Sequence, residues 1–285
     1  MRLSIDHQTG FRYSTPVKSS YNEARMTPAA SEHQTIWSSR VSIEPAAWSF
    51  SYTDYWGTRV TTFELHEAHE RLTVHAQAVV DTRGDDLSWD TDRRVAPSDL
   101  GWSALRDRGV IDRMAEYLTL NRRTAPAPEL AALAAEVADQ PPRLAALDVC
   151  RILDDRLRYE KGSTEVTSAA ADVWGLGVGV CQDYSHVALG ALRSIGLPAR
   201  YVSGYLHPKP SAQIGQAVTG ESHAWVEWWD GGWNAFDPTN SVEIGTRHVT
   251  LGRGRDYGDV PPFKGLFSGP KSEGHTVTVE VTRLA

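Results

Sequence analysis

A glycine-rich loop runs directly into a helical pattern in the stretch GLGVGVCQDYSHVALGALRSIGLP, residues 175–198. After Cys181 the apolar residues recur at three- and four-residue spacing, as they do on one face of a helix. Gly196 and Pro198 then end the pattern, because glycine favours the position just past a helix and proline cannot continue it. The stretch therefore predicts a helix that begins at Cys181.

The residues around this helix predict an α+β fold in which helices come first and an antiparallel sheet follows. Apolar spacing indicates three further helices upstream, and runs of β-branched and aromatic residues indicate strands downstream. The expected helices cover about 110–118, 129–138 and 143–158, and the expected strands cover 199–206, 222–229, 233–236 and 275–284. Asp230, Gly231 and Gly232 favour a hairpin turn between two of these strands.

Residues 1–82 predict strands throughout. In the clearest run, residues 72–80, apolar side chains occupy every second position, which is typical of a strand with one buried face. Prolines and glycines separate the runs, so we expect an amino-terminal antiparallel β-sandwich. The acidic, turn-rich residues 83–103 indicate a linker, and residues 104–285 indicate a second, α+β domain.

Composition excludes several classes of protein. The chain of 285 residues has a formal net charge of −7 and no basic domain, so nucleic acid is not an expected partner. It has no run of 18 apolar residues and no apolar signal core at the amino terminus, so we expect a cytoplasmic protein without a membrane partner. Its two cysteines, Cys150 and Cys181, are then expected to be thiols, and Cys150 falls beside the apolar stripe of its helix.

Cys181 has the position that a reactive thiol needs. The first backbone N–H groups of a helix have no partner within it, and the helix dipole is positive at that end. Both effects favour a thiolate over a thiol, and the same N–H groups can stabilise the oxyanion that forms when a thiolate attacks a carbonyl. A buried, inert cysteine is the alternative interpretation.

His223 and Asp237 are predicted to meet across the hairpin. His223 begins the strand SHAWVEWW, residues 222–229, and Asp237 ends the next strand in NAFDPT, residues 234–239. If 230–232 form the turn, the two side chains oppose each other to within a residue or two. A carboxylate beside an imidazole fixes its tautomer and stabilises the imidazolium, so the pair suits a general base.

Five motifs together resemble the transglutaminase-like superfamily. They are GVCQDYSH at 179–186, RSIGLPARYVSGY at 193–205, SHAW at 222–225, FDPT at 236–239 and GRDYGDVPP at 254–262. The order Cys, His, Asp, with gaps of 42 and 14 residues, is also similar to that family. Residues 1–82 resemble the β domain that precedes the catalytic domain in bacterial members. The resemblance therefore covers nearly the whole chain.

The resemblance implies a papain-like core and an acyl-thioester reaction on an amide. It assigns the nucleophile to Cys181, the general base to His223 and the orienting acid to Asp237. The backbone N–H of Cys181 is one expected oxyanion donor, and the side chains of Trp174 and Gln182 are alternatives for the second. Asp183 is expected to support the first turn of the helix electrostatically. The chemistry requires no cofactor or metal.

Three functions remain open at this point. The first is a thiol hydrolase that cleaves a peptide or protein amide. The second is an acyl transferase or deamidase that acts on glutamine, since family members include crosslinkers, deamidases, peptidases and peptide N-glycanases. The third is a binding protein that keeps the three residues without turnover. Whether water or an amine accepts the acyl group depends on the shape of loops, which the sequence does not specify.

Overall fold

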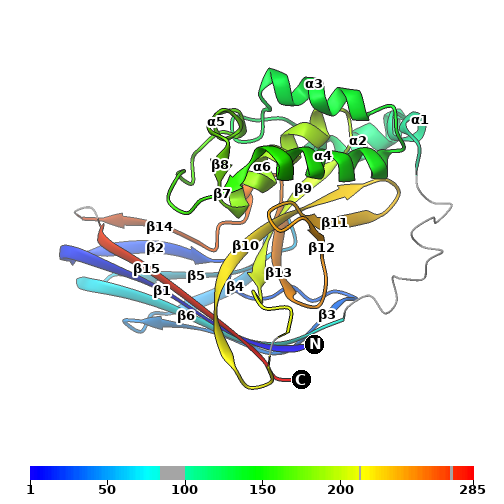
Figure 1. The fold of residues 1–285 in the computed structure, drawn as a ribbon. Coiled ribbons are helices and arrows are strands. Elements are labelled where there is room, and N and C mark those ends of the chain that lie inside the picture. The colour runs from blue at the N-terminus through cyan, green and yellow to red at the C-terminus, as the bar shows by residue number, and fades with distance from the viewer. Residues whose placement is uncertain (84–99, 212, 270–271) are drawn as a thin grey trace.

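The computed structural model describes residues 1–83, 100–211, 213–269 and 272–285 of the chain (Figure 1). None of the helices in these ranges has the length and hydropathy of a membrane span. Residues 1–83, the amino-terminal half of the fold, contain strands and no helix, as predicted. They are β1 (Arg2–Val17), β2 (Ser19–Ala24), β3 (Gln34–Glu44), β4 (Ser49–Thr53), β5 (Arg59–Leu65) and β6 (His69–Thr82).

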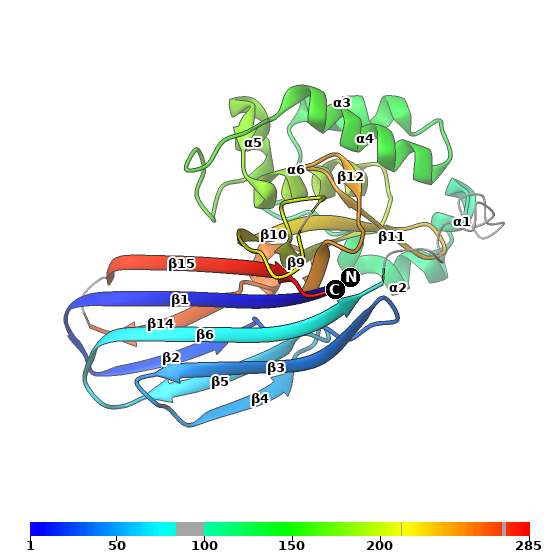
Figure 2. The same ribbon diagram turned by 60° about the horizontal axis from the view of Figure 1, so that its bottom comes forward.

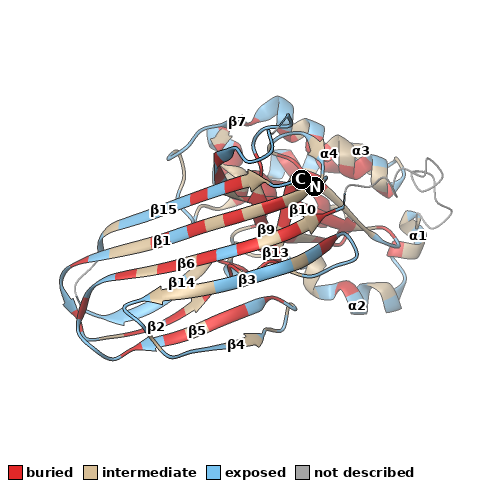
Figure 3. Cartoon of the chain, turned by 90° about the horizontal axis from the view of Figure 1, so that it is seen from below, coloured by how far each residue is buried: buried red, intermediate tan, exposed pale blue. Residues whose placement is uncertain are grey.

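These strands form two facing layers with an apolar core between them (Figure 2). Buried and solvent-facing residues alternate along β6, because successive side chains of a strand point to opposite faces (Figure 3). Phe63, Leu72 and Val74 are among the residues that fill the space between the layers. The predicted antiparallel β-sandwich is therefore confirmed.

The rest of the fold, from residue 100 onward, contains helices and then an antiparallel sheet, with a short parallel pair of strands, 158–159 and 178–179, between the helices, which confirms the predicted α+β class. The helices are α1 (Trp102–Leu105), α2 (Arg108–Leu118), α3 (Pro128–Val137), α4 (Pro142–Arg156), α5 (Ala170–Leu176), α6 (Cys181–Ser194) and the 3-10 turn η2 (Tyr257–Asp259). The strands are β7 (Arg158–Tyr159), β8 (Val178–Gly179), β9 (Ala199–Leu206), β10 (Ala217–Trp229), β11 (Trp233–Asp237), β12 (Val242–Glu243), β13 (His248–Gly254), β14 (Phe263–Ser268) and β15 (Ser272–Arg283).

Helix α6 lies at the centre of the core of this half. It packs against α3, α4 and α5 on one side and against β9 and β10 on the other. Its apolar residues Val187, Leu189 and Leu192 are all fully buried. Burial on so many sides fixes the helix, and with it the place of the residue that begins it.

Strand β10 joins the two halves of the molecule. Residues 217–220 pair with β15, whereas residues 221–228 pair with β9 and residues 226–229 with β11. Strand β15 lies between β10 and β1 in one sheet of nine strands, so the sandwich and the α+β half share that sheet (Figure 1). The shared sheet ties the position of the second half to the first.

The division of the chain at the carboxyl terminus differs from the predicted one. We expected residues 104–285 to form the second domain, but β14 pairs with β2 and β15 pairs with β1. Residues 263–283 therefore complete the sandwich, because the free edges of β1 and β2 take up their hydrogen bonds. Most of the predicted linker, residues 84–99, lies outside the described residues.

Candidate active site

Cys181 is the first residue of α6 and is partly exposed. The backbone N–H of Val180 donates to Oδ2 of Asp183 at 2.9 Å, and the hydroxyl of Thr164 donates to the same oxygen at 2.6 Å. Gly179 lets this turn close, since a Cβ there would lie 2.8 Å from the Cβ of Asp183. The local sequence therefore fixes the helix start and leaves the thiol at its tip.

His223 lies beside the thiol and hydrogen-bonds it. It lies in β10, and the sulfur of Cys181 is 4.0 Å from the carbonyl oxygen of the preceding residue, Ser222. On the other side of the ring, Nε2 lies 2.6 Å from Oδ2 of Asp237. With Nε2 committed to the carboxylate, Nδ1 is the nitrogen that remains for Cys181.

The predicted hairpin holds this pair together. Val226 pairs with Phe236 across β10 and β11, so His223 and Asp237 stand diagonally opposite, as the turn position predicted. Asp237 is fully buried. Its Oδ1 accepts the backbone N–H groups of Thr239 and Asn240, and its Oδ2 accepts the side-chain amide of Asn240 at 2.7 Å. The carboxylate is thus held at both oxygens.

The pKa values of the pair favour an imidazolium next to a carboxylate. Burial by itself would lower the pKa of His223, but hydrogen bonds with Asp237 and Cys181 outweigh it and raise that pKa to about 10. Burial would likewise raise the pKa of Asp237, yet the hydrogen bonds from His223 and His248 hold it well below its ordinary value. An imidazolium beside a thiol favours the thiolate, which is the nucleophilic form.

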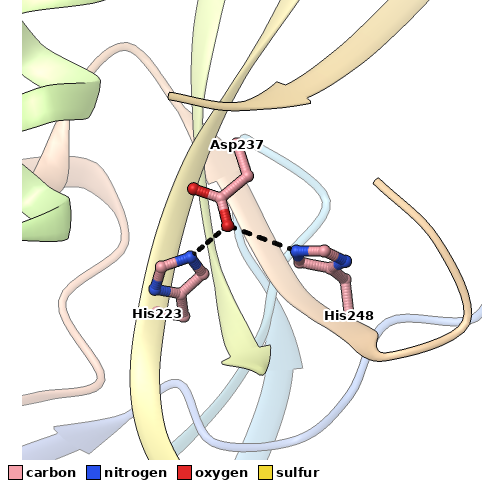
Figure 4. A group of neighbouring side chains, drawn as sticks. All are labelled: His223, Asp237 and His248. Atoms are coloured by element: carbon pink, nitrogen blue, oxygen red, sulfur yellow. Dashed lines mark hydrogen bonds and ion pairs between the residues drawn. The ribbon is translucent and has the colours of Figure 1, made fainter. Parts of the chain in front are cut away.

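The structure brings His248 to Asp237 (Figure 4). It also brings Asn240 there, and neither residue was predicted from the sequence. Nε2 of His248 lies 3.4 Å from Oδ2 of Asp237. Asn240 comes directly after the FDPT motif, residues 236–239. A polar residue in the turn that follows a buried acid can hydrogen-bond its carboxylate, so the sequence could have indicated Asn240. His248 reaches the site because β13 pairs with β9, and no local sequence pattern predicts that pairing.

The ligand atoms of His223, Asp237 and His248 lie within 4.8 Å of one another, which is close enough for the three side chains to bind one metal ion. A metal needs histidine nitrogens without protons. Gly245 donates its N–H to Nδ1 of His248 at 3.2 Å, so the proton of the neutral ring sits on Nε2, which faces Asp237. Both histidines therefore suit donation to the carboxylate, and the group fits a hydrogen-bond network better than a metal centre.

The two side chains that were predicted as alternatives for the second oxyanion donor, Trp174 and Gln182, both make hydrogen bonds to other parts of the chain. The indole N–H of Trp174, which is 2% exposed, donates to Glu129 at 2.9 Å. The side-chain amide of Gln182 donates to the carbonyl of Val166 at 3.1 Å. The single indole N–H of Trp174 therefore already has an acceptor away from the thiol, whereas the amide of Gln182 keeps a second N–H, so Gln182 stays a prediction for the second oxyanion donor.

Asp183 is placed as predicted, in the first turn of α6, where it accepts the N–H of Val180. Burial raises its pKa, against the two hydrogen bonds that it accepts. Cys150 lies in α4 with no exposed surface, and burial raises the pKa of its thiol to about 12. The two cysteines of the chain therefore have very different surroundings.

Two family models match the chain. One described as the transglutaminase-like superfamily matches residues 131–238, and one described as the bacterial transglutaminase-like N-terminal region matches residues 3–81. An uncharacterised protein of Mycobacterium leprae is 43% identical over 285 residues, which is 100% of this chain and 99% of that protein. An uncharacterised protein of Mycobacterium tuberculosis is 33% identical over 98% of this chain and 91% of its own length.

Two further similarities bear on fold and chemistry. The crystal structure of a candidate cysteine protease from Cytophaga hutchinsonii superposes with a TM-score of 0.75 and 20% identity, over 98% of this chain and 90% of that one. At this identity the likeness concerns the fold. A protein-glutamine gamma-glutamyltransferase of Pseudomonas aeruginosa is 33% identical over 94 residues, which is 29% of this chain and 14% of that protein.

Proposed function

This chain belongs to the transglutaminase-like superfamily, and from that premise we propose that it is a thiol hydrolase that cleaves a peptide or protein amide. The observation that supports the proposal most is the contact of 2.6 Å between His223 and Asp237, beside a cysteine at the start of a buried helix. Each of these groups has the surroundings that its role requires.

The first half of the reaction forms a thioester. The thiolate of Cys181 attacks the amide carbon, and the backbone N–H of Cys181 at the start of α6 stabilises the oxyanion. The imidazolium of His223 gives its proton to the leaving nitrogen as the C–N bond breaks, so an amine departs and the acyl group stays on sulfur. Asp237 stabilises the imidazolium and holds its ring in place throughout.

The second half returns the enzyme to its starting state. Neutral His223 takes a proton from water as the water oxygen attacks the thioester carbon. The C–S bond then breaks, a carboxylic acid leaves, and the thiolate of Cys181 again faces an imidazolium. If an amine takes the place of water, the same steps give a new amide.

Amine transfer to glutamine is the second candidate. It is favoured by the similarity to a protein-glutamine gamma-glutamyltransferase over 94 residues. Deamidation is the form of this reaction in which water accepts the acyl group and ammonia leaves the glutamine side chain. A third candidate, binding without turnover, predicts that none of these products forms.

One experiment separates these functions. The full chain is incubated with a glutamine-containing peptide pool and a primary amine, and mass spectrometry follows cleaved, deamidated and amine-bearing peptides. Hydrolysis of main-chain amides predicts cleaved peptides, which are lost in Cys181→Ser and His223→Ala and kept in Cys150→Ser. Amine-bearing or deamidated peptides with the same mutant pattern would replace hydrolysis with transfer, and no product from any variant would support a binding role.

A further inference from the structure

Asp237 contacts two histidines, and the reaction above uses only one of them. His223 extends from β10 and His248 from the start of β13, and Figure 4 shows the same carboxylate oxygen between the two rings. The distances to that oxygen are 2.6 Å from His223 and 3.4 Å from His248. The reaction steps above therefore give no role to the second buried imidazole at Asp237, that of His248.

The hydrogen bonds of His248 favour the tautomer that donates to Asp237. Its Nδ1 accepts the N–H of Gly245, so the neutral ring carries its proton on Nε2, toward the carboxylate. The charged groups that face it are Asp237, His223 and Arg247, and its ring also packs edge-on against Trp225. Burial lowers the pKa of His248, with His223 and Arg247 adding to that effect, so the neutral ring is favoured.

The other donors to Asp237 show why this contact matters. Thr239 and Asn240 belong to the same turn as Asp237, so they move with it. Among the hydrogen bonds of Asp237 that the structure describes, those from His223 and His248 alone come from distant parts of the chain. Asn240 also lies 3.4 Å from Nε2 of His223, but it belongs to the turn of Asp237. His248 is thus the contact from another strand that can hold the carboxylate independently of His223.

We propose that His248 is a positioning residue that donates to Asp237 and holds the carboxylate aimed at His223. It does not touch the thiol or the substrate, and it acts through Asp237. The catalytic importance of this role rests on the proposed function, but the role itself is a statement about three side chains. The long contact of 3.4 Å is consistent with a hydrogen bond that tightens when the site is charged and occupied.

Two amide substitutions test this role with closely matched chemistry. In His248→Gln the side-chain amide nitrogen can occupy the place of Nε2 and still donate to Asp237. In His248→Asn it can reach only the place of Nδ1, one methylene short. His248 lines a cavity of about 640 Å³, so the shorter side chain leaves room for solvent and creates no overlap.

The readout is the titration of His223, followed by NMR in the full chain with isotope-labelled histidine. We expect the pKa of His223 to fall by about one unit or more in His248→Asn, because a less well-held Asp237 stabilises the imidazolium less. In His248→Gln we expect it to stay close to that of the unmodified chain. Equal values of this pKa in all three proteins would overturn the proposal.

A second measurement needs no variant and decides the matter if His248→Asn does not fold. The ¹⁵N shifts of the His248 ring at neutral pH report which nitrogen carries the proton. Protonated Nε2 with bare Nδ1 is expected, and the opposite tautomer would contradict the proposed donation. Neither NMR readout requires turnover. If the full chain forms no product, the proposed function fails, and these two NMR measurements still decide whether His248 positions Asp237.

Discussion

Three buried histidines of this protein differ in pKa because their neighbouring side chains differ. His223 is buried beside a carboxylate, which raises its pKa to about 10. His7 and His186 are as deeply buried, but burial dominates there and lowers the pKa of each to about 4. The same side chain therefore favours its charged form in one place and its neutral form in two others, according to its partner.

The lowered pKa of His7 predicts a loss of stability in acid. Native His7 stays neutral down to about pH 4, whereas the unfolded chain takes up this proton near pH 6.5. The contribution is therefore complete above pH 6.5 and is lost as the pH falls toward 4. Between pH 7 and pH 5 it amounts to about 2 kcal/mol at most.

Urea unfolding at pH 7 and pH 5 measures this contribution. Native His7 hydrogen-bonds the hydroxyl groups of Tyr205 and Thr9, and His7→Gln removes the titrating ring. The variant is expected to lose less free energy of unfolding between the two pH values than the unmodified chain, even where it is less stable at both. An identical loss in the two proteins would show that His7 does not stay neutral in the fold.

At the scale of elements, the start of α6 depends on close packing against β8. Gly179 allows the approach, since an added Cβ would lie 2.8 Å from Asp183 and 3.2 Å from Val173. Gly175, four residues earlier in α5, has no atom of the described chain within 4 Å of the corresponding position. The two glycines therefore differ in what their missing side chains would meet.

Gly179→Ala is expected to displace the first turn of α6. Overpacking of this kind costs about 1–3 kcal/mol of the free energy of unfolding, and the reactivity of Cys181 should fall with it. Gly175→Ala is the matched control: it should leave the reactivity of Cys181 unchanged and raise the free energy of unfolding by up to about 1 kcal/mol, because alanine favours the helix more than glycine does. Urea unfolding and thiol alkylation measure both effects, and equal behaviour of the two variants would show that the packing at Gly179 is not needed.

Most of the helices and the hairpin at the candidate site could be predicted from local sequence. Apolar spacing gave the helices that became α2, α3, α4 and α6, and the hairpin turn placed His223 against Asp237. The partners of Trp174 and Gln182 could not be predicted, because Glu129 and Val166 reach them through tertiary packing. His248 was missed for the same reason, since only the pairing of β13 with β9 brings it to the site.

At the scale of the whole molecule, the two halves share one sheet. Strand β15 ends the chain, yet it pairs with β1 near the amino terminus and with β10 next to the candidate site. Pairing across so many residues leaves no signature in local sequence, which is why the predicted division at residues 104–285 missed it. An amino-terminal deletion of residues 1–82 would remove β1, one of the two partners of β15, as well as the other strands of residues 1–82.

The shared sheet predicts a single cooperative unfolding transition. Calorimetry is expected to show one heat-absorption peak. Cys150 of α4, which is fully buried, should become reactive at the same temperature. Two peaks, with Cys150 exposed in only one of them, would mean that the halves unfold separately. In that case the nine-stranded sheet would not couple them energetically.

The thiolate–imidazolium pair is tested most simply by the pH dependence of alkylation of Cys181 by iodoacetamide, in the unmodified chain and in His223→Ala. Cys150 is the internal control, because it is fully buried. We predict rapid labelling of Cys181 well below pH 8, which is lost or moved to higher pH in His223→Ala, with Cys150 unlabelled in both. A rate that follows an ordinary thiol pKa near 8.5 in both proteins would contradict a thiolate–imidazolium pair at this site.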